Sequence, residues 1–200
     1  MDALSFDILL QIPDLKKSHL ELRSSKHNLN RKRNMFKRFL KLYDFVIDII
    51  SPTIDDTKLE YQVIKLFKNI GYKAHKPSNT RDVDGIVKMK TCTLGIEVKN
   101  SRFPEENELF QALKYCERNK TKGNFLHPII IWNNAKTNQN FDKFRIEDAI
   151  NNHYGLLTTK ELLKGFIKLK QNKIYLDNFE KIISRTGNIK FSNKAINESG

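Results

Sequence analysis

The stretch Arg81-Asp-Val-Asp-Gly-Ile-Val-Lys-Met-Lys-Thr-Cys-Thr-Leu-Gly-Ile-Glu-Val-Lys99 decides the fold. It contains Asp84, then Glu97 thirteen residues later, and Lys99 two residues beyond that. Alternate residues of a strand point to the same face, so Glu97 and Lys99 are expected to project together. Antiparallel pairing of 84–87 with 94–99, through a turn at 89–93, would bring Asp84 close to Glu97.

Two carboxylates and one amine in a single pocket suit a hard divalent cation, because Mg²⁺ binds one or two carboxylates and keeps several waters. The ammonium of Lys99 would orient a metal-bound water or offset charge that develops on a phosphate. The spacing therefore indicates hydrolysis of a phosphodiester bond. A solvated strand face with an ion pair between Glu97 and Lys99 is the alternative interpretation.

The flanking segments predict two amphipathic helices. Upstream, apolar residues recur at helical spacing from Leu59 to Ile70 and stop at Gly71. Glu60 is in phase with this stripe, so we expect it to face the sheet as a further acidic residue; a capping box from Thr57 to Glu60 is the alternative.

Downstream, residues 104–120 predict a helix on which Gln111 and Tyr115 share one face. By this spacing alone, they are part of an ordinary half-buried helix face. The run His127-Pro-Ile-Ile-Ile-Trp132 then predicts a buried strand. The resulting order is typical of an α/β sandwich, with a central mixed sheet flanked by helices.

The Asp, Glu-x-Lys pattern on adjacent strands resembles the PD-(D/E)XK nuclease superfamily, with Val83 where the family loosely keeps a proline. More narrowly, residues 43–191 resemble the cleavage domain of FokI-type type IIS restriction endonucleases. The resembling stretches are Thr57-Lys-Leu-Glu-Tyr-Gln-Val, Gly71-Tyr72, Val83-Asp-Gly-Ile-Val, Gly95-Ile-Glu-Val-Lys, Tyr115-Cys-Glu-Arg-Asn, Leu156-Leu-Thr-Thr-Lys-Glu-Leu-Leu, a helix near Phe179, and Gly187-Asn-Ile-Lys-Phe. They occur in the same order as in that family.

This resemblance implies a restriction-endonuclease-like fold and a metal-dependent endonuclease. It makes Asp84 and Glu97 metal ligands, with the backbone carbonyl of Val98 as a third, and Lys99 the group that orients water or stabilises charge. The resemblance also makes Glu60 a fourth catalytic candidate, and it makes Gln111 and Tyr115 candidate accessory groups, because a Gln-x-x-x-Tyr helix follows the Glu-x-Lys strand in several branches of the superfamily. The implied cofactor is Mg²⁺, which Mn²⁺ is able to replace.

Composition is compatible with this interpretation. The 36 basic and 23 acidic residues give a net charge of +13, which favours a polyanion such as double-stranded DNA, although a solvated basic surface is the alternative. Cys92 and Cys116 lack the spacing of a zinc site or a disulfide framework, and no apolar run is long enough to span a membrane. We therefore expect a cytoplasmic protein.

The N-terminal region predicts a long amphipathic helix from Phe36 to Ile50, which Ser51-Pro52 ends. The basic run Arg31-Lys-Arg stands at its positive end, where a phosphate backbone or simply solvent would compensate it. We accordingly divide the chain into an N-terminal basic, partly helical extension at 1–40 and a nuclease domain at 41–200.

Residues 1–30 contain no recognisable DNA-reading module, whereas type IIS enzymes usually carry one. The expectation is therefore the small subunit of a heterodimeric type IIS enzyme, which cuts one strand while a larger subunit recognises the sequence. A junction resolvase or repair endonuclease of the same superfamily, acting as a homodimer, and a non-catalytic nucleic-acid-binding protein are the alternatives.

Overall fold

The structure is a computed structural model that describes residues 46–78, 83–100, 106–121, 126–135, 137 and 139–191. Its first segment, 46–50, is helical and ends before Ser51, as predicted. The earlier part of that predicted helix, the basic run at 31–33 and the whole N-terminal extension at 1–40 lie outside the described residues. The division of the chain at residue 40 stays a prediction.

Helices and strands alternate through most of the described chain. The helices are α4 (Asp56–Ile70), α5 (Glu106–Thr121), α6 (Lys143–Asn151), α7 (Thr159–Lys170) and α8 (Leu176–Ile183). The strands are β1 (Lys73–His75), β2 (Gly85–Lys88), β3 (Thr93–Asn100), β4 (Leu126–Asn133), β5 (Gly155–Thr158) and β6 (Gly187–Asn188). None of the described helices is long and apolar enough to cross a membrane.

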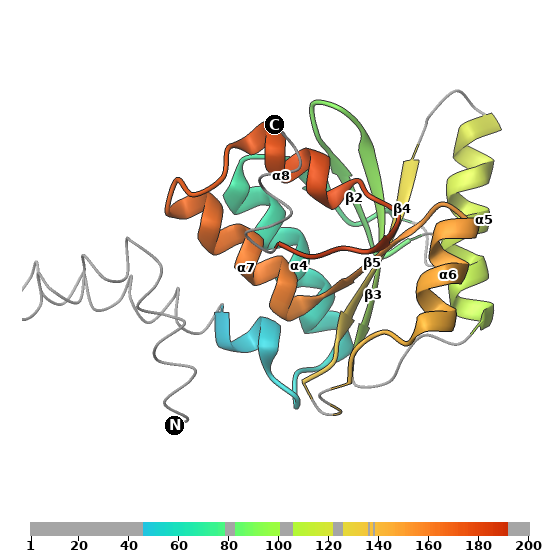
Figure 1. The fold of residues 1–200 in the computed structure, drawn as a ribbon, viewed down its shortest axis with the longest axis horizontal. Helices are drawn as coiled ribbons and strands as arrows, with labels where there is room; N and C mark the ends of the chain where they lie inside the picture. The colour runs from blue at the N-terminus through green and yellow to red at the C-terminus, as the bar shows by residue number, and fades with distance from the viewer. Residues whose placement is uncertain are drawn as a thin grey trace, which may run out of the picture.

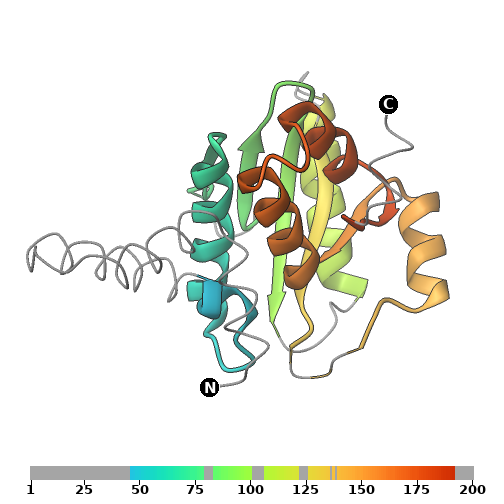
Figure 2. The ribbon, with the colours of Figure 1, turned by 60° about the vertical axis from the view of Figure 1, so that its left-hand side comes forward.

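The strands form one six-stranded sheet in the order β1-β2-β3-β4-β5-β6. The first three strands are antiparallel, and β3 through β6 are parallel, so the sheet is mixed. The predicted hairpin is confirmed, with Gly85 opposite Ile96 and Lys88 opposite Thr93. Helices cover both faces of the sheet (Figures 1 and 2), which confirms the predicted α/β sandwich.

Two apolar clusters, one on each side of the sheet, hold the layers together. Ile129 and Ile131 of β4 belong to the larger cluster with residues of α4, α7 and α8, whereas Ile130 and Trp132 belong to the smaller cluster with residues of α5 and α6. Successive side chains of a strand point to opposite faces, so a strand covered on both sides must be apolar throughout. This explains the unbroken apolar run that predicted β4.

The start of α4 differs from one of the two predicted arrangements. The helix begins at Asp56, and the Asp55 side chain accepts a hydrogen bond from the Lys58 N–H, 3.1 Å away, as an N-cap. Thr57 therefore lies inside the helix, and the capping box from Thr57 to Glu60 is wrong. The predicted end is confirmed, because Gly71 has φ 113° and its N–H closes the last turn.

A buried carboxylate fixes the turn of the β2–β3 hairpin to α8. Glu180 is fully buried, and its carboxylate accepts hydrogen bonds from the Lys90 N–H (3.2 Å), the Thr91 N–H (3.0 Å) and the Thr91 hydroxyl (2.8 Å). Burial opposes ionisation of Glu180, but these hydrogen bonds outweigh it and lower the pKa of this carboxyl. The hairpin is thus held at the end opposite to Asp84.

We expect Glu180→Ala to lower the free energy of unfolding by about 2 kcal/mol at neutral pH, because it removes three acceptor contacts and leaves a cavity. Chemical denaturation measures this. Asp177→Ala on the same helix is the matched control. Asp177 is exposed and lies 3.6 Å from the ammonium of Lys90. Its replacement should lower the free energy of unfolding by less than about 0.5 kcal/mol. Equal losses in the two variants would contradict the anchoring role of Glu180.

Candidate active site

Asp84 lies directly against β3, as the sequence predicted. The register pairs Gly85 with Ile96, so Asp84, one residue earlier, comes next to Glu97 and Val98. The Val98 N–H donates a hydrogen bond to Asp84 Oδ2 at 2.8 Å. This contact fixes one oxygen of the carboxylate beside β3.

Glu97 and Lys99 project from the same face of β3, and they are in contact. Lys99 Nζ lies 2.9 Å from Glu97 Oε1, with Glu97 buried and the Lys99 side chain 20% exposed. The ion pair of the alternative interpretation is therefore present. It is part of a largely buried cluster rather than of a solvated strand face, because Asp84, just before β2, lies against β3 beside it.

The environment of Asp84 holds its pKa well above the usual range. Burial raises the pKa to about 6, the Val98 N–H opposes this, the charge of Glu60 raises it further, and the charges of Lys99 and Lys76 lower it. Ionising a buried carboxylate of this kind without a nearby cation has a high free-energy cost. A shifted acid in such a cluster is typical of a functional site.

Glu60 belongs to this cluster, as its phase on α4 indicated. Its side chain is 15% exposed and forms an ion pair with the ammonium of Lys76, just after β1. The contact with Glu60 raises the pKa of Lys76, against the effect of burial. Lys76 carries no signal in the sequence that predicts this contact, because the pair depends on how α4 packs on β1.

The accessory residues are only partly described. Gln111 lies on α5, but its side chain is outside the described residues. Tyr115 is half buried and packs against the smaller cluster, on the face of the sheet from which Trp132 projects. Lys99 is paired with Trp132 in the register and shares that face. Roles for Gln111, Tyr115 and the Val98 carbonyl stay predictions.

A polar network ties together the strand ends beside Lys99. Asn133 Nδ2 donates to the Ser51 carbonyl (2.8 Å) and to Asn100 Oδ1 (3.0 Å), and the Thr159 hydroxyl donates to Asn133 Oδ1 at 3.3 Å. Asn100 Nδ2 in turn donates to the Ile54 carbonyl at 2.5 Å. The ends of β3 and β4, the start of α7 and the segment before α4 are therefore held in one arrangement.

The donor set at this cluster fits a magnesium ion. Within the described ranges, no group of three or more His, Cys, Asp and Glu side chains lies close enough to hold a metal. Asp84 and Glu97 offer two carboxylates to a metal, and water would take the other positions. Mg²⁺ is commonly bound in this way, with one or two carboxylates and several waters.

Comparison with known proteins finds likeness in structure rather than in sequence. No family model and no curated protein sequence matches the chain. A solved structure of restriction endonuclease FokI is similar, with a TM-score of 0.55 and 16% identity over 84% of this chain. A structure of FokI bound to DNA gives a TM-score of 0.54 and 16% identity over 88% of this chain.

The likeness is to part of FokI only. The chain spans 35% and 34% of the two FokI chains that it matches. The chain thus has a restriction-endonuclease-like α/β fold, similar to about a third of FokI.

Proposed function

We propose that this chain is a magnesium-dependent DNA endonuclease. One observation carries the proposal: Asp84, Glu97 and Lys99 meet across the β2–β3 hairpin, with Lys99 Nζ 2.9 Å from Glu97 Oε1, on the fold of a restriction endonuclease. The raised pKa of Asp84 supports it, because a carboxylate that is costly to bury alone gains most from a bound cation.

Each residue has a distinct role in the proposed reaction. Asp84 and Glu97 would hold Mg²⁺, which supplies Lewis acidity toward a phosphoryl oxygen and a water of lowered pKa. Lys99 orients the attacking water or offsets the negative charge that develops on the phosphate. The water oxygen forms a bond to phosphorus while the bond from phosphorus to the leaving oxygen breaks, and the water proton passes to solvent.

Double-stranded DNA is the proposed substrate. The net charge of +13 favours a polyanion, and one of the similar FokI structures is bound to DNA. The charge by itself is compatible with any nucleic acid. The proposal for DNA therefore rests on the fold and the site together.

We further propose that the chain is the small subunit of a heterodimeric type IIS restriction endonuclease. In this arrangement it cuts one strand, while a larger subunit recognises the sequence and cuts the other. The isolated chain should then have little or no sequence-specific activity.

A nicking assay tests both parts of the proposal. We expect the purified chain with a candidate large subunit and Mg²⁺ to cut one labelled strand of a duplex at a fixed position, with EDTA abolishing the cut. The chain alone should give no site-specific product. Glu97→Gln is the control, since it keeps the shape of the side chain and removes its charge.

The outcomes separate the possible functions. Sequence-specific double-strand cleavage by the chain alone would rule out the subunit role and leave the nuclease intact. Cleavage of branched DNA without a partner would favour a junction resolvase. Failure of Mg²⁺ to bind near Asp84, measured by calorimetry on the wild type and Asp84→Asn, would point to a non-catalytic protein.

A further inference from the structure

A second ion pair stands beside the candidate active site. Lys76, one residue after β1, pairs with Glu60 of α4, whose side chain is 15% exposed. The register of β1 with β2 brings Lys76 next to the start of β2, just after Asp84. The pair is therefore on the β1 side of Asp84, whereas Glu97 and Lys99 are on its β3 side.

The charges of this pair act on Asp84. Burial is the main cause that raises the pKa of Asp84; the charge of Glu60 adds to it, and the charge of Lys76 opposes it. The hydrogen bond to Glu60 is the main cause that raises the pKa of Lys76, and the charge of Asp84 also contributes. Lys76 thus compensates two carboxylates, one by direct contact and the other through space.

The described charges of the cluster are balanced by a single divalent cation. Three carboxylates, Glu60, Asp84 and Glu97, and two ammonium groups, Lys76 and Lys99, leave one net negative charge when all are ionised. One divalent cation turns this into one positive charge, which the negative charge of a phosphodiester balances. A second divalent cation would leave an excess of positive charge close to two ammonium groups, which is unfavourable.

A second cation would also need the carboxylate that Lys76 holds. The two ions of a two-metal hydrolytic site lie about 3.5–4 Å apart, so a second ion would need oxygen ligands close to those of the first. On the β1 side of Asp84, the described acidic residue of the cluster is Glu60, and its carboxylate is engaged by Lys76. An ammonium group in contact with a carboxylate competes directly with a metal for its oxygens.

We propose that Lys76 is a positioning residue of the candidate active site. It keeps the Glu60 carboxylate from binding a metal, and its ammonium group takes the place of a second cation beside Asp84. The site then binds one divalent cation, through Asp84 and Glu97. This inference rests on the proposed metal-dependent function and adds the number of ions that the site uses.

The test counts the Mn²⁺ ions that bind to the full chain without DNA, with free Mn²⁺ measured by electron paramagnetic resonance. We expect one ion per wild-type chain and loss of this ion in Asp84→Asn. Lys76→Met keeps an apolar stem but frees the Glu60 carboxylate, so it should bind two ions at the same concentration of free Mn²⁺. Glu60→Gln/Lys76→Met should return the count to one, and Lys76→Arg, which keeps the charge, should also bind one.

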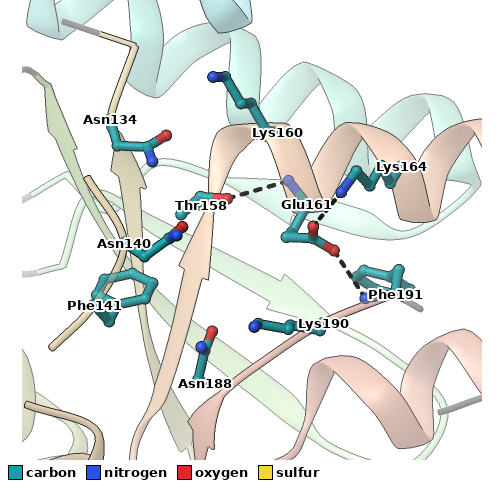
Figure 3. Close-up of a pocket in the computed structure, with 10 residues that line it drawn as sticks. All are labelled: Asn134, Asn140, Phe141, Thr158, Lys160, Glu161, Lys164, Asn188, Lys190 and Phe191. Carbon is teal, nitrogen blue, oxygen red and sulfur yellow. Dashed lines mark hydrogen bonds and ion pairs between the residues drawn. The ribbon is translucent and has the colours of Figure 1, made fainter. Parts of the chain in front are cut away.

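The matched control is another lysine–glutamate pair of similar exposure, on α7. Lys164 Nζ lies 2.5 Å from Glu161 Oε1, and the two side chains are 59% and 18% exposed, against 54% and 15% for Lys76 and Glu60. Figure 3 shows this pair at a pocket in which Glu161 is the only carboxylate among the described lining residues. Lys164→Met should therefore leave the count at one.

Two ions in the wild type, or a single ion in a folded Lys76→Met chain, overturns the inference. The second result is expected of an ion pair that only ties α4 to β1. Circular dichroism checks that each variant is folded, and cleavage of DNA by the wild type is measured separately. If the wild type cleaves DNA while Lys76→Met binds one ion, only the inference fails. If the counts are as expected and no cleavage occurs with the partner present, only the proposed function fails.

Discussion

Lys99→Ala should reduce the rate of DNA cleavage by about a hundredfold or more, with DNA binding retained. Loss of a single charge-stabilising group at a reacting centre typically has an effect of this size. Lys99 Nζ lies 2.9 Å from Glu97 Oε1 and lowers the pKa of Asp84, so it belongs to the carboxylate cluster itself. Single-turnover cleavage of a strand-labelled duplex, in the presence of the partner if one is required, measures the rate.

The control separates a chemical role of Lys99 from a structural one. Removing the lysine also leaves the buried Glu97 carboxylate without this ion pair, which lowers stability. The double variant Glu97→Gln/Lys99→Met removes both charges and should restore stability without restoring cleavage. Lys88→Ala, on the exposed end of β2, should leave the rate unchanged. If a folded Lys99→Ala chain still cleaves DNA at the wild-type rate, Lys99 has no chemical role and serves only as the ion-pair partner of Glu97.

The local pattern was sufficient to predict the hairpin and the strand face that carries the candidate site. Alternation in a strand places Glu97 and Lys99 together, and pairing through a short turn brings Asp84 to them, so the proximity of these three residues could be predicted from spacing alone. The buried strand β4 was equally predictable, since a short, unbroken apolar run rich in isoleucine is typical of a strand that is covered on both faces.

Contacts between distant segments could not be predicted in this way. Lys76 reaches Glu60 only because β1 packs beside α4, and Glu180 reaches Thr91 across 89 residues of sequence. Asn133 gave no motif, yet it connects Ser51, Asn100 and Thr159. Such hydrogen bonds depend on tertiary packing, and the residue types that form them are common on any surface.

The start of α4 shows how a local rule can also mislead. Thr57 and Glu60 have the spacing of a capping box, but Asp55 is two residues earlier and is an equally good N-cap. With Asp55 as the N-cap, the side chain of Glu60 is not part of the cap of α4. Its carboxylate then faces Lys76 and raises the pKa of Asp84. The two interpretations of Glu60 were not exclusive, so the failure of the capping box leaves its catalytic role a prediction.

Asp84→Asn should abolish cleavage and yet stabilise the metal-free protein above pH 6. The pKa of Asp84 is raised from 3.8 to about 6 by burial, so the folded state binds this proton more tightly than the unfolded state does. The cost of the charge is absent below about pH 4, grows as the pH rises through the folded pKa, and is fully present above it. A shift of this size corresponds to at most about 3 kcal/mol.

Asparagine is the appropriate replacement because its carbonyl oxygen can still accept the hydrogen bond from the Val98 N–H, which is 2.8 Å from Asp84 Oδ2. Chemical denaturation in EDTA at pH 4 and pH 8 measures the effect: we expect equal stabilities at the lower pH and a more stable variant at the higher one. Added Mg²⁺ should make the difference in the free energy of unfolding between wild type and Asp84→Asn smaller at pH 8. The reason is that a cation compensates the negative charge of ionised Asp84, which asparagine lacks. A variant that is less stable than the wild type at pH 8 in EDTA would show that the Asp84 carboxylate is satisfied without a metal.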